Sequence, residues 1–302
     1  MEKIHGIISI NKPFGITSTQ VVREIKRSSM QKKVGHSGTL DPTAEGVLPI
    51  CIGQGTRVVE NIMEFKKEYI GTIRLGISTD TLDSMGKRLT ISNVDSISKK
   101  IIEENLKIFY GEIKQTPPMF SALKNKGKRL YDIARSGNSI QLTPRNVSVS
   151  KIKLIEWRPP NAKILVQCSK GFYMRSLAED LGKILNVGAH LSYLVRKSVG
   201  PFKINESISL ADAIESFKEN TWDKYLLNPD FALGKIPSTI LDEINENKIK
   251  TGQTIFLTLP LEKHKLGDQI KAYGHRGNFV GILSKISENG TWKPDKVFAS
   301  NQ

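Results

Sequence analysis

The sequence predicts an α+β protein, in which a mixed, largely antiparallel sheet is flanked by helices and followed by a small β-rich module. Three observations support this fold class. Strand-like and helix-like segments alternate without a regular βαβ order. Between residues 97 and 109, isoleucine, leucine and phenylalanine recur at helical spacing. After a junction at residues 228–238, short strand-like pieces are separated by glycine and polar turns.

Two elements are predicted before residue 30. The stretch "HGIISINKPFG" indicates a short strand that is closed by Lys12, Pro13 and Gly15. A helix then starts in "TSTQVVREIKR", where Thr17 and Gln20 have the spacing of a capping box.

The middle of the chain predicts a strand, a loop and a basic turn. In residues 68–76, alternate residues from Tyr69 to Leu75 share one face of a strand. Residues 77–87 are rich in Thr, Asp, Ser and Gly, which favours a loop. The segment from residue 115 to 137 breaks at a double proline, passes a basic turn and resumes as a helix.

Residues 162–185 predict a strand followed by a glycine turn and a helix. Ile164, Val166 and Cys168 lie on one strand face, and Leu177 and Leu181 lie on the helix. Together with the junction, this pattern divides the chain into a larger part, residues 1–232, and a module of residues 233–302.

Charge favours a polyanionic partner. The formal net charge is +15 and the pI is about 9.6. Residues 1–232 carry +12 of this charge and residues 233–302 carry +3. Basic surfaces attract phosphates, so we expect the larger part to bind the polyanion. A generally basic surface without a specific partner is the alternative.

Composition also indicates a compartment. No run of eighteen apolar residues occurs, which argues against a membrane span, and the N-terminal stretch is too polar for a signal peptide. Cys51 and Cys168 lie far apart in apolar segments, which predicts buried thiols rather than a zinc site. We therefore expect a cytoplasmic protein without a metal.

The stretch "GHSGTLDPTAEGVLPICIG" places one carboxylate, Asp41, just before an apolar run. Pro42 disfavours the helical region for the residue before it, so Asp41 is extended or in a turn. Gly38 and Gly46 permit close approach of a ligand to the backbone. Local chemistry alone also fits an ordinary turn.

Six stretches match one known family in the same order: "INKPFGITS", "GHSGTLDPTAEGVLPICIG", "KKEYIGTIRLGISTDTLDSMGK", "QTPPMFSALKNKGKRLYDIAR", "CSKGFYMRSLAEDLG" and "GAHLSYLVRKSVGPF". Over roughly residues 4–215 the chain resembles the TruB family of bacterial tRNA pseudouridine-55 synthases. The resemblance implies the pseudouridine synthase fold and isomerisation of uridine 55 in the tRNA T-loop, without cofactor or metal. We further expect a monomer whose partner is the T-arm of tRNA.

The resemblance implies that Asp41 is the nucleophile that acts on a flipped-out uridine, at either the ribose or the base. Arg175, in "GFYMRS", would hold this carboxylate and keep it ionised. Tyr69 would pack on the base and take part in proton transfer at C5, although a plain core tyrosine fits the same position. The sequence shows no obvious second acid beside Asp41.

Further positions follow from the same resemblance. Tyr173 and Leu194 would line the base pocket, and Lys12 with Pro13 would support its floor. His36 would pack into the space that the flipped base vacates. Core packing for Tyr173 and Leu194, and a turn hydrogen bond for His36, are the alternatives.

Three polar regions have looser assignments. The basic run "KNKGKR" falls where the family has an insertion that clasps the RNA loop, which suggests phosphate contacts, although a solvated turn fits too. Its cationic residues are Lys124, Lys126, Lys128 and Arg129. Asp80, in "STDT", matches a polar motif near the site. The tail resembles a small RNA-binding module of the PUA type.

Three other functions are compatible with parts of the sequence. A guide-dependent synthase for ribosomal RNA would need accessory proteins and a guide RNA. A non-catalytic RNA-binding protein would predict loss of Asp41, Tyr69 or Arg175, and all three are present. A phosphate loop in "GQGTR" is disfavoured because Gly53 and Gly55 lack P-loop spacing.

Overall fold

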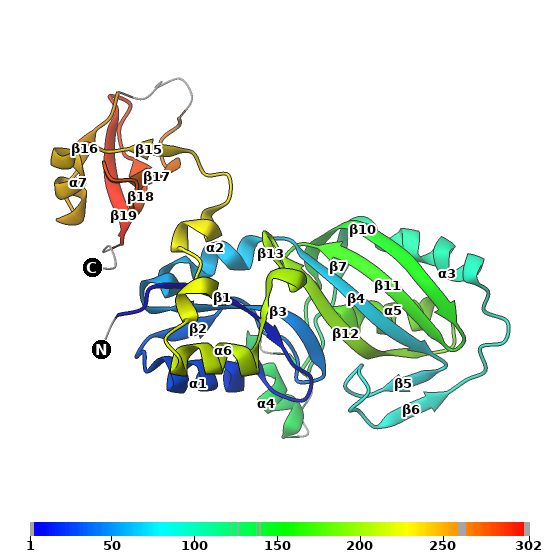
Figure 1. Ribbon diagram of the computed structural model, residues 1–302. Helices are drawn as coiled ribbons and strands as arrows, with labels where there is room; N and C mark the ends of the chain where they lie inside the picture. The colour runs from blue at the N-terminus through cyan, green and yellow to red at the C-terminus, as the bar shows by residue number, and fades with distance from the viewer. Residues whose placement is uncertain are drawn as a thin grey trace.

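The computed structural model describes residues 3–121, 123–125, 127–136, 138, 140–258 and 264–298. Its main feature is a ten-stranded sheet in the order β14-β1-β3-β12-β4-β11-β10-β7, with β2 paired to β3 and β13 to β12 (Figure 1). The strands are β1 (Gly6–Lys12), β2 (Val34–His36), β3 (Ala44–Ile52), β4 (Lys67–Leu75), β7 (Gly111–Gln115), β10 (Arg145–Arg158), β11 (Asn161–Cys168), β12 (Ala189–Val199), β13 (Phe202–Lys203) and β14 (Ile208–Ser209). Only the β1–β14 and β3–β12 pairs of this sheet are parallel, which confirms the predicted mixed, largely antiparallel sheet.

Helices flank this sheet, as predicted. They are α1 (Ser18–Ser29), α2 (Val59–Glu64), α3 (Lys99–Leu106), α4 (Leu130–Arg135), α5 (Met174–Ile184), α6 (Leu210–Lys218) and, beside the second sheet, α7 (Glu243–Lys250). Short 3-10 turns are η1 (Gly53–Val58), η2 (Lys107–Phe109), η3 (Ile204–Glu206), η4 (Trp222–Tyr225) and η5 (Pro229–Leu233).

Local sequence signals explain several of these elements. Thr17 accepts from the backbone of Gln20 at 3.1 Å, and the Gln20 side chain accepts from the Thr17 backbone at 2.7 Å, so the capping box is present. The predicted strand faces are also confirmed, because β11 buries Ile164, Val166 and Cys168.

The prediction of a loop over residues 77–87 was wrong at its start. Residues Ile77–Thr79 form β5, which pairs with β6 (Arg88–Ile91) in a separate hairpin. The polar residues between them make the turn, whereas the flanking residues pair through their backbones and through the Ser78 and Thr90 hydroxyls, 2.5 Å apart. Turn composition identifies the tip of a hairpin but not where its strands begin.

The position of β3 at the centre of the sheet depends on a glycine. Gly46 has φ +106°, and a Cβ at this position would lie 2.2 Å from the carbonyl oxygen of Arg196 on β12. The parallel pairing of β3 with β12 therefore requires a residue without a side chain here. This pairing brings the loop before β3 beside the middle of β12.

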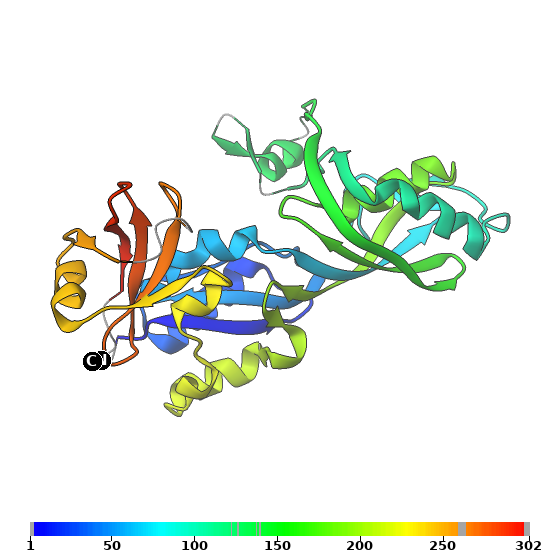
Figure 2. The ribbon, with the colours of Figure 1, turned by 90° about the horizontal axis from the view of Figure 1, so that it is seen from above.

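The second sheet has the order β15-β17-β18-β19-β16 and lies at the end of the main sheet away from α3 (Figures 1 and 2). Its strands are β15 (Ser238–Ile240), β16 (Ile255–Phe256), β17 (Gln269–Tyr273), β18 (Phe279–Lys285) and β19 (Thr291–Val297). The predicted β-rich C-terminal module is therefore confirmed, and α7 within it was not predicted. Its helical pattern is weak because it is mostly polar, with only Glu246 and Ile249 buried.

The two sheets share a hydrophobic cluster. Ala232 and Leu233 pack in it with Ile7 of β1, Ile282 of β18 and Phe298. Since residues on both sides of position 232 contribute to the same cluster, the division into residues 1–232 and 233–302 stays a proposal.

Cys51 and Cys168 are buried, free thiols, as predicted, and burial raises the pKa of each to about 12. They lie in the buried faces of β3 and β11. Among the residues that the structure describes, no helix is both long enough and apolar enough to cross a membrane.

Candidate active site

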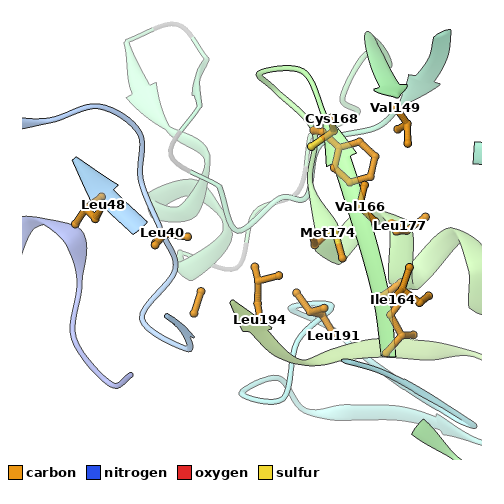
Figure 3. Packing of buried hydrophobic residues seen from close by; sticks show 14 of the residues in the cluster. Leu40, Leu48, Val149, Ile164, Val166, Cys168, Met174, Leu177, Leu191 and Leu194 are labelled. Atoms are coloured by element: carbon orange, nitrogen blue, oxygen red, sulfur yellow. The ribbon is translucent and has the colours of Figure 1, made fainter. Parts of the chain in front are cut away.

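A cleft of about 570 Å³ lies where the loop before β3 meets β4, β12 and the start of α5. Its apolar wall includes Leu40, Met174, Leu191 and Leu194, which approach one another from these separate segments (Figure 3). The cleft also receives five cationic side chains from the described residues: Lys67, Arg145, Lys170, Arg175 and Arg196. An apolar pocket ringed by cations suits a flat base attached to a phosphate chain.

Asp41 and Arg175 meet in this cleft. The Nε atom of Arg175 lies 2.9 Å from Oδ2 of Asp41, and Nη2 donates to Oδ1 at 3.1 Å. This two-point contact fixes the plane of the carboxylate. The Arg175 side chain is 5% exposed and that of Asp41 is 35% exposed, so the acid is the more accessible partner of the pair.

The loop that carries Asp41 is anchored on both sides. The Leu40 side chain is buried, and its backbone N–H donates to the Ser18 hydroxyl at 2.9 Å. After Asp41, the Pro42 carbonyl accepts from the Gly15 N–H at 2.8 Å, and the Asp41 carbonyl accepts from Ala44 at 3.0 Å. These contacts hold the carboxylate at the cleft, although Asp41 itself belongs to no helix or strand.

The position of Arg175 is set by the start of α5, of which it is the second residue. Tyr173 precedes the helix, and its backbone N–H and carbonyl are both bonded to the side chain of buried Gln115, at 2.8 and 3.1 Å. Arg175 is therefore in the first helical turn, where its side chain points back toward the residues before the helix.

Burial raises the pKa of Asp41 above its ordinary value of 3.8. The charge of Arg175 acts in the opposite direction, while that of Asp83 adds to the rise. The carboxyl is consequently more basic than a solvated aspartate, and it remains paired with a permanent cation.

Asp83 is a second acid near the pair, which the sequence did not make obvious. Its Oδ2 is 4.0 Å from Nη1 of Arg175, and its side chain is 13% exposed. The Thr81 hydroxyl and the Met85 N–H donate to its Oδ1 at 2.6 and 3.0 Å. The turn between β5 and β6 thus supplies an acid that sequence spacing from Asp41 could not reveal.

Asp80, the acid that the sequence did single out, has another contact. Its Oδ1 accepts from the Lys87 N–H at 2.8 Å across the same turn. It does not line the cleft. This hydrogen bond closes the tip of the β5–β6 hairpin.

Tyr69, Tyr173 and Leu194 all line the cleft with Asp41 and Arg175. Tyr69 is on β4, opposite Arg196 of β12, and burial raises the pKa of its hydroxyl. Burial also raises the pKa of Tyr173. Two neutral phenols and a leucine therefore share the cleft with the carboxylate.

Lys12 and His36 lie outside the set of residues that line this cleft. Lys12 is fully buried, its ammonium donates to the carbonyls of Pro13 and Ile16 at 2.8 and 2.7 Å, and burial lowers its pKa to about 8. His36 is half-buried on β2, and its Nδ1 accepts from the Gly38 N–H at 3.3 Å. Burial lowers the pKa of His36.

The basic run after residue 123 is described only as backbone. Lys124 belongs to β8 (Lys124–Asn125), and Lys128 and Arg129 form β9 (Lys128–Arg129), in a two-stranded hairpin. Lys126 lies outside the described residues. The predicted phosphate contacts of this run stay a prediction.

Arg196 is a further residue that the sequence did not single out. It is 1% exposed, its Nε donates to the Val47 carbonyl at 2.7 Å and its Nη2 donates to the Gly38 carbonyl at 3.1 Å. Arg196 therefore connects β12 with β3 and with the loop that leads to Asp41. In the sequence it is one of two adjacent cations on a strand, with no distinguishing neighbour.

Two family models match adjoining parts of the chain. A family model described as TruB family pseudouridylate synthase (N terminal domain) matches residues 26–174. A second model, described as tRNA pseudouridylate synthase B C-terminal domain, matches residues 175–233. The two matches meet between Met174 and Arg175, so the Asp41–Arg175 contact joins the two matched regions.

Similar proteins extend over nearly the whole chain. The tRNA pseudouridine synthase B of Clostridioides difficile is 42% identical over 307 aligned residues, covering 98% of this chain and 100% of that protein. The protein of the same name from Dehalococcoides mccartyi is 39% identical, covering 97% and 96%. Among solved structures, a chain of a Cbf5–Nop10–Gar1 complex is 26% identical with a TM-score of 0.73, covering 98% of this chain and 85% of that one. A chain of an H/ACA RNP bound to a substrate RNA has the same TM-score at 24% identity, covering 99% and 86%.

Proposed function

The chain belongs to the TruB family of pseudouridylate synthases, which are isomerases, and we propose that it converts uridine to pseudouridine at position 55 in the T-loop of tRNA. The observation that carries this proposal is the two-point contact between Arg175 and Asp41 in a cleft walled by Tyr69, Tyr173 and Leu194. The relatives named as tRNA pseudouridine synthase B support tRNA as the substrate.

The reaction exchanges one bond for another within the nucleotide. The bond from ribose C1′ to uracil N1 breaks, the detached base turns, and a bond from C1′ to C5 forms. C5 loses its proton and N1 gains one, so no atom is added or removed. A cofactor that carries electrons or groups has no part in this balance.

Asp41 acts as the nucleophile of this exchange, through attack on the ribose or the base. A carboxylate is nucleophilic when it is ionised. Arg175 supports this role because its charge opposes the effect of burial on the Asp41 pKa and its fork fixes the direction of the oxygens. Asp83, 4.0 Å from the same guanidinium, acts in the opposite direction, because its charge adds to the rise in the Asp41 pKa.

The two phenols suit the base. Tyr69 offers a flat ring for stacking and a neutral hydroxyl, whose pKa is raised further by burial. A hydroxyl beside C5 would relay the proton that C5 loses by releasing its own proton in the same step, for example to water. Leu194 and Tyr173 close the remaining sides of the base pocket.

A uridine within a folded loop reaches this pocket only after it leaves its stack, which costs roughly a few kcal/mol. We assign to His36 the support of the flipped state by packing into the vacated space, since its neutral form is favoured by burial. Lys12 supports the floor indirectly, through the turn whose Gly15 N–H bonds the Pro42 carbonyl.

RNA contacts beyond the base come from two regions in this proposal. The hairpin of β8 and β9 carries the basic run and would clasp the loop through phosphates. The second sheet, within residues 233–302, would act as a PUA-type RNA-binding module.

A second candidate is guide-dependent modification of ribosomal RNA, favoured by the fold shared with chains of H/ACA and Cbf5 complexes. One experiment separates it from the first. The purified chain is incubated with an unmodified tRNA transcript and nothing else, and pseudouridine is mapped by mass spectrometry. Modification at position 55 supports the tRNA function, and no product on tRNA without added proteins and guide RNA contradicts it.

A further inference from the structure

Two buried cations, Lys67 of β4 and Arg196 of β12, line the cleft of the active site. The two residues are 7% and 1% exposed, so both charges are largely withdrawn from solvent. Lys67 lies two residues before Tyr69 on the same strand face, and Arg196 is paired with Tyr69 across β4 and β12. The two cations, which we call the cation pair, therefore share a sheet face with the ring that would stack on the base.

Neither member of the cation pair has an acidic partner. Among the described residues, neither forms an ion pair with a carboxylate. Lys67 donates to the Met63 carbonyl instead, and Arg196 donates to the carbonyls of Val47 and Gly38 at 2.7 and 3.1 Å. Carbonyl oxygens satisfy N–H groups but leave the positive charge in place, and a buried charge without a counter-charge is costly.

The two charges also act on each other and on Tyr69. Burial lowers the pKa of Lys67 to about 8, and the charge of Arg196 lowers it as well. Glu64 acts in the opposite direction, but its carboxylate is paired with Lys170. Burial raises the pKa of the Tyr69 hydroxyl, and the charge of Arg196 opposes that rise. A negative charge on a ligand beside Tyr69 would relieve both the burial cost and the repulsion within the cation pair.

Isomerisation of uridine creates such a charge on the base. If Asp41 attacks the ribose, its oxygen bonds C1′ while the electron pair of the C1′–N1 bond leaves with uracil, and the charge spreads over N1, O2 and O4. If Asp41 attacks C6, the electron pair of the C5–C6 double bond moves toward O4. On both routes the carboxylate is finally released, C1′ bonds C5, C5 loses its proton and N1 gains one, so the base is neutral again.

We infer that Lys67 and Arg196 stabilise the negative charge that develops on the uracil ring during the reaction. This inference rests on the proposed function, which brings a uridine beside Tyr69. The charge is absent from the bound substrate, so cations that are already in place act on the rate and hardly on substrate affinity. Arg196 also holds the loop that carries Asp41, and the test is therefore placed on Lys67.

The test uses the full chain and two tRNAs, ligated from synthetic halves, that carry uridine or 5-fluorouridine at position 55. Fluorine withdraws electrons and stabilises the pyrimidine anion, so the fluorinated base depends less on the cation pair. Loss of the starting nucleotide is followed in single turnover at neutral pH, by digestion and chromatography with mass detection. The Kd of each tRNA is measured by filter binding.

Three variants are compared with wild type. Lys67→Met removes the charge and keeps an apolar chain of similar length, and Lys67→Arg keeps a charge at the same position. The matched control is Lys66→Met, at the adjacent lysine, which is exposed and does not line the cleft. Thermal unfolding checks that each variant is folded, and Lys67→Gln replaces Lys67→Met if that protein is unstable.

We expect Lys67→Met to slow the uridine tRNA by about 100-fold and the 5-fluorouridine tRNA by about tenfold or less, with each Kd changed by less than about threefold. Lys67→Arg should retain more of the rate than Lys67→Met, and Lys66→Met should match wild type. Equal slowing of the two tRNAs, a weakened Kd with an unchanged rate, or the same loss in Lys66→Met would overturn the inference. No pseudouridine with wild type would contradict the proposed function itself, whereas normal conversion by wild type with equal slowing of both tRNAs in Lys67→Met contradicts this inference alone.

Discussion

The guanidinium of Arg175 contacts the carboxylate of Asp41 at two points, 2.9 and 3.1 Å, and the acid is the more exposed partner. The arginine is covered by protein on its other sides and also faces Asp83. The acid is therefore presented to a ligand in one orientation.

Replacement of Arg175 by Met should lower kcat for pseudouridine formation at neutral pH by roughly 100-fold. Without the guanidinium, burial raises the Asp41 pKa unopposed and the carboxylate loses its fixed direction, so less of the ionised, oriented nucleophile is present. The Arg175→Lys variant retains the charge but not the fork, and we expect an intermediate rate. Single-turnover kinetics on tRNA measures both, and equal rates for Arg175→Met and wild type would argue against the pairing.

The pH dependence of kcat/KM tests the electrostatics of the site. The ionised carboxylate is the nucleophile, and burial raises the pKa of Asp41 above 3.8. Activity should therefore be lost as pH falls, with a midpoint above 3.8. Because the charge of Asp83 is one cause of the raised pKa, Asp83→Asn should move this midpoint to lower pH. A midpoint that moves upward in Asp83→Asn would be inconsistent with this assignment.

Arg196 should prove necessary both for the stability of the protein and for the position of the loop that carries Asp41. Its guanidinium bonds the Val47 and Gly38 carbonyls in a buried setting, and loss of one such partner costs roughly 1–3 kcal/mol. Arg196→Met should therefore lower the free energy of unfolding by about 2–5 kcal/mol and reduce kcat more than it raises KM. Arg158→Met, at an arginine side chain that is 82% exposed, is the control and should change neither. A stable and fully active Arg196→Met protein would refute this role.

Gly46→Ala tests the parallel pairing of β3 with β12. The new methyl group would meet a backbone oxygen at 2.2 Å from a residue with φ +106°, so neither a rotamer change nor a side-chain shift relieves the contact. We expect a loss of about 3 kcal/mol or more in unfolding free energy. Gly35→Ala, in the same motif but with no atom within 4 Å of the added methyl, should be nearly neutral in chemical denaturation. Similar losses for the two variants would contradict the proposed pairing.

The sequence predicted elements that depend on near neighbours. The capping box of α1 and the buried face of β11 require only residues within a few positions of one another. The convergence of Asp41 with Arg175 was expected through resemblance to a family, since 134 positions separate them. No local pattern contains that contact.

What the sequence did not predict depends on distant pairing. Asp83 reaches Arg175 because β5 and β6 form a hairpin whose turn directs one of several similar polar residues to the site. Arg196 reaches the Asp41 loop because β12 runs parallel to β3. Both facts follow from strand register, which the composition of each segment leaves open.

The central claim is that the Asp41 carboxylate performs the isomerisation. Its most direct test is pseudouridine at position 55 of an unmodified tRNA transcript, mapped after incubation with pure wild type or Asp41→Asn, with the tRNA Kd measured for both. The amide has nearly the same shape and no nucleophilic charge. We predict complete conversion by wild type and none by Asp41→Asn, with Kd changed by less than about threefold. Normal turnover by Asp41→Asn would contradict the account.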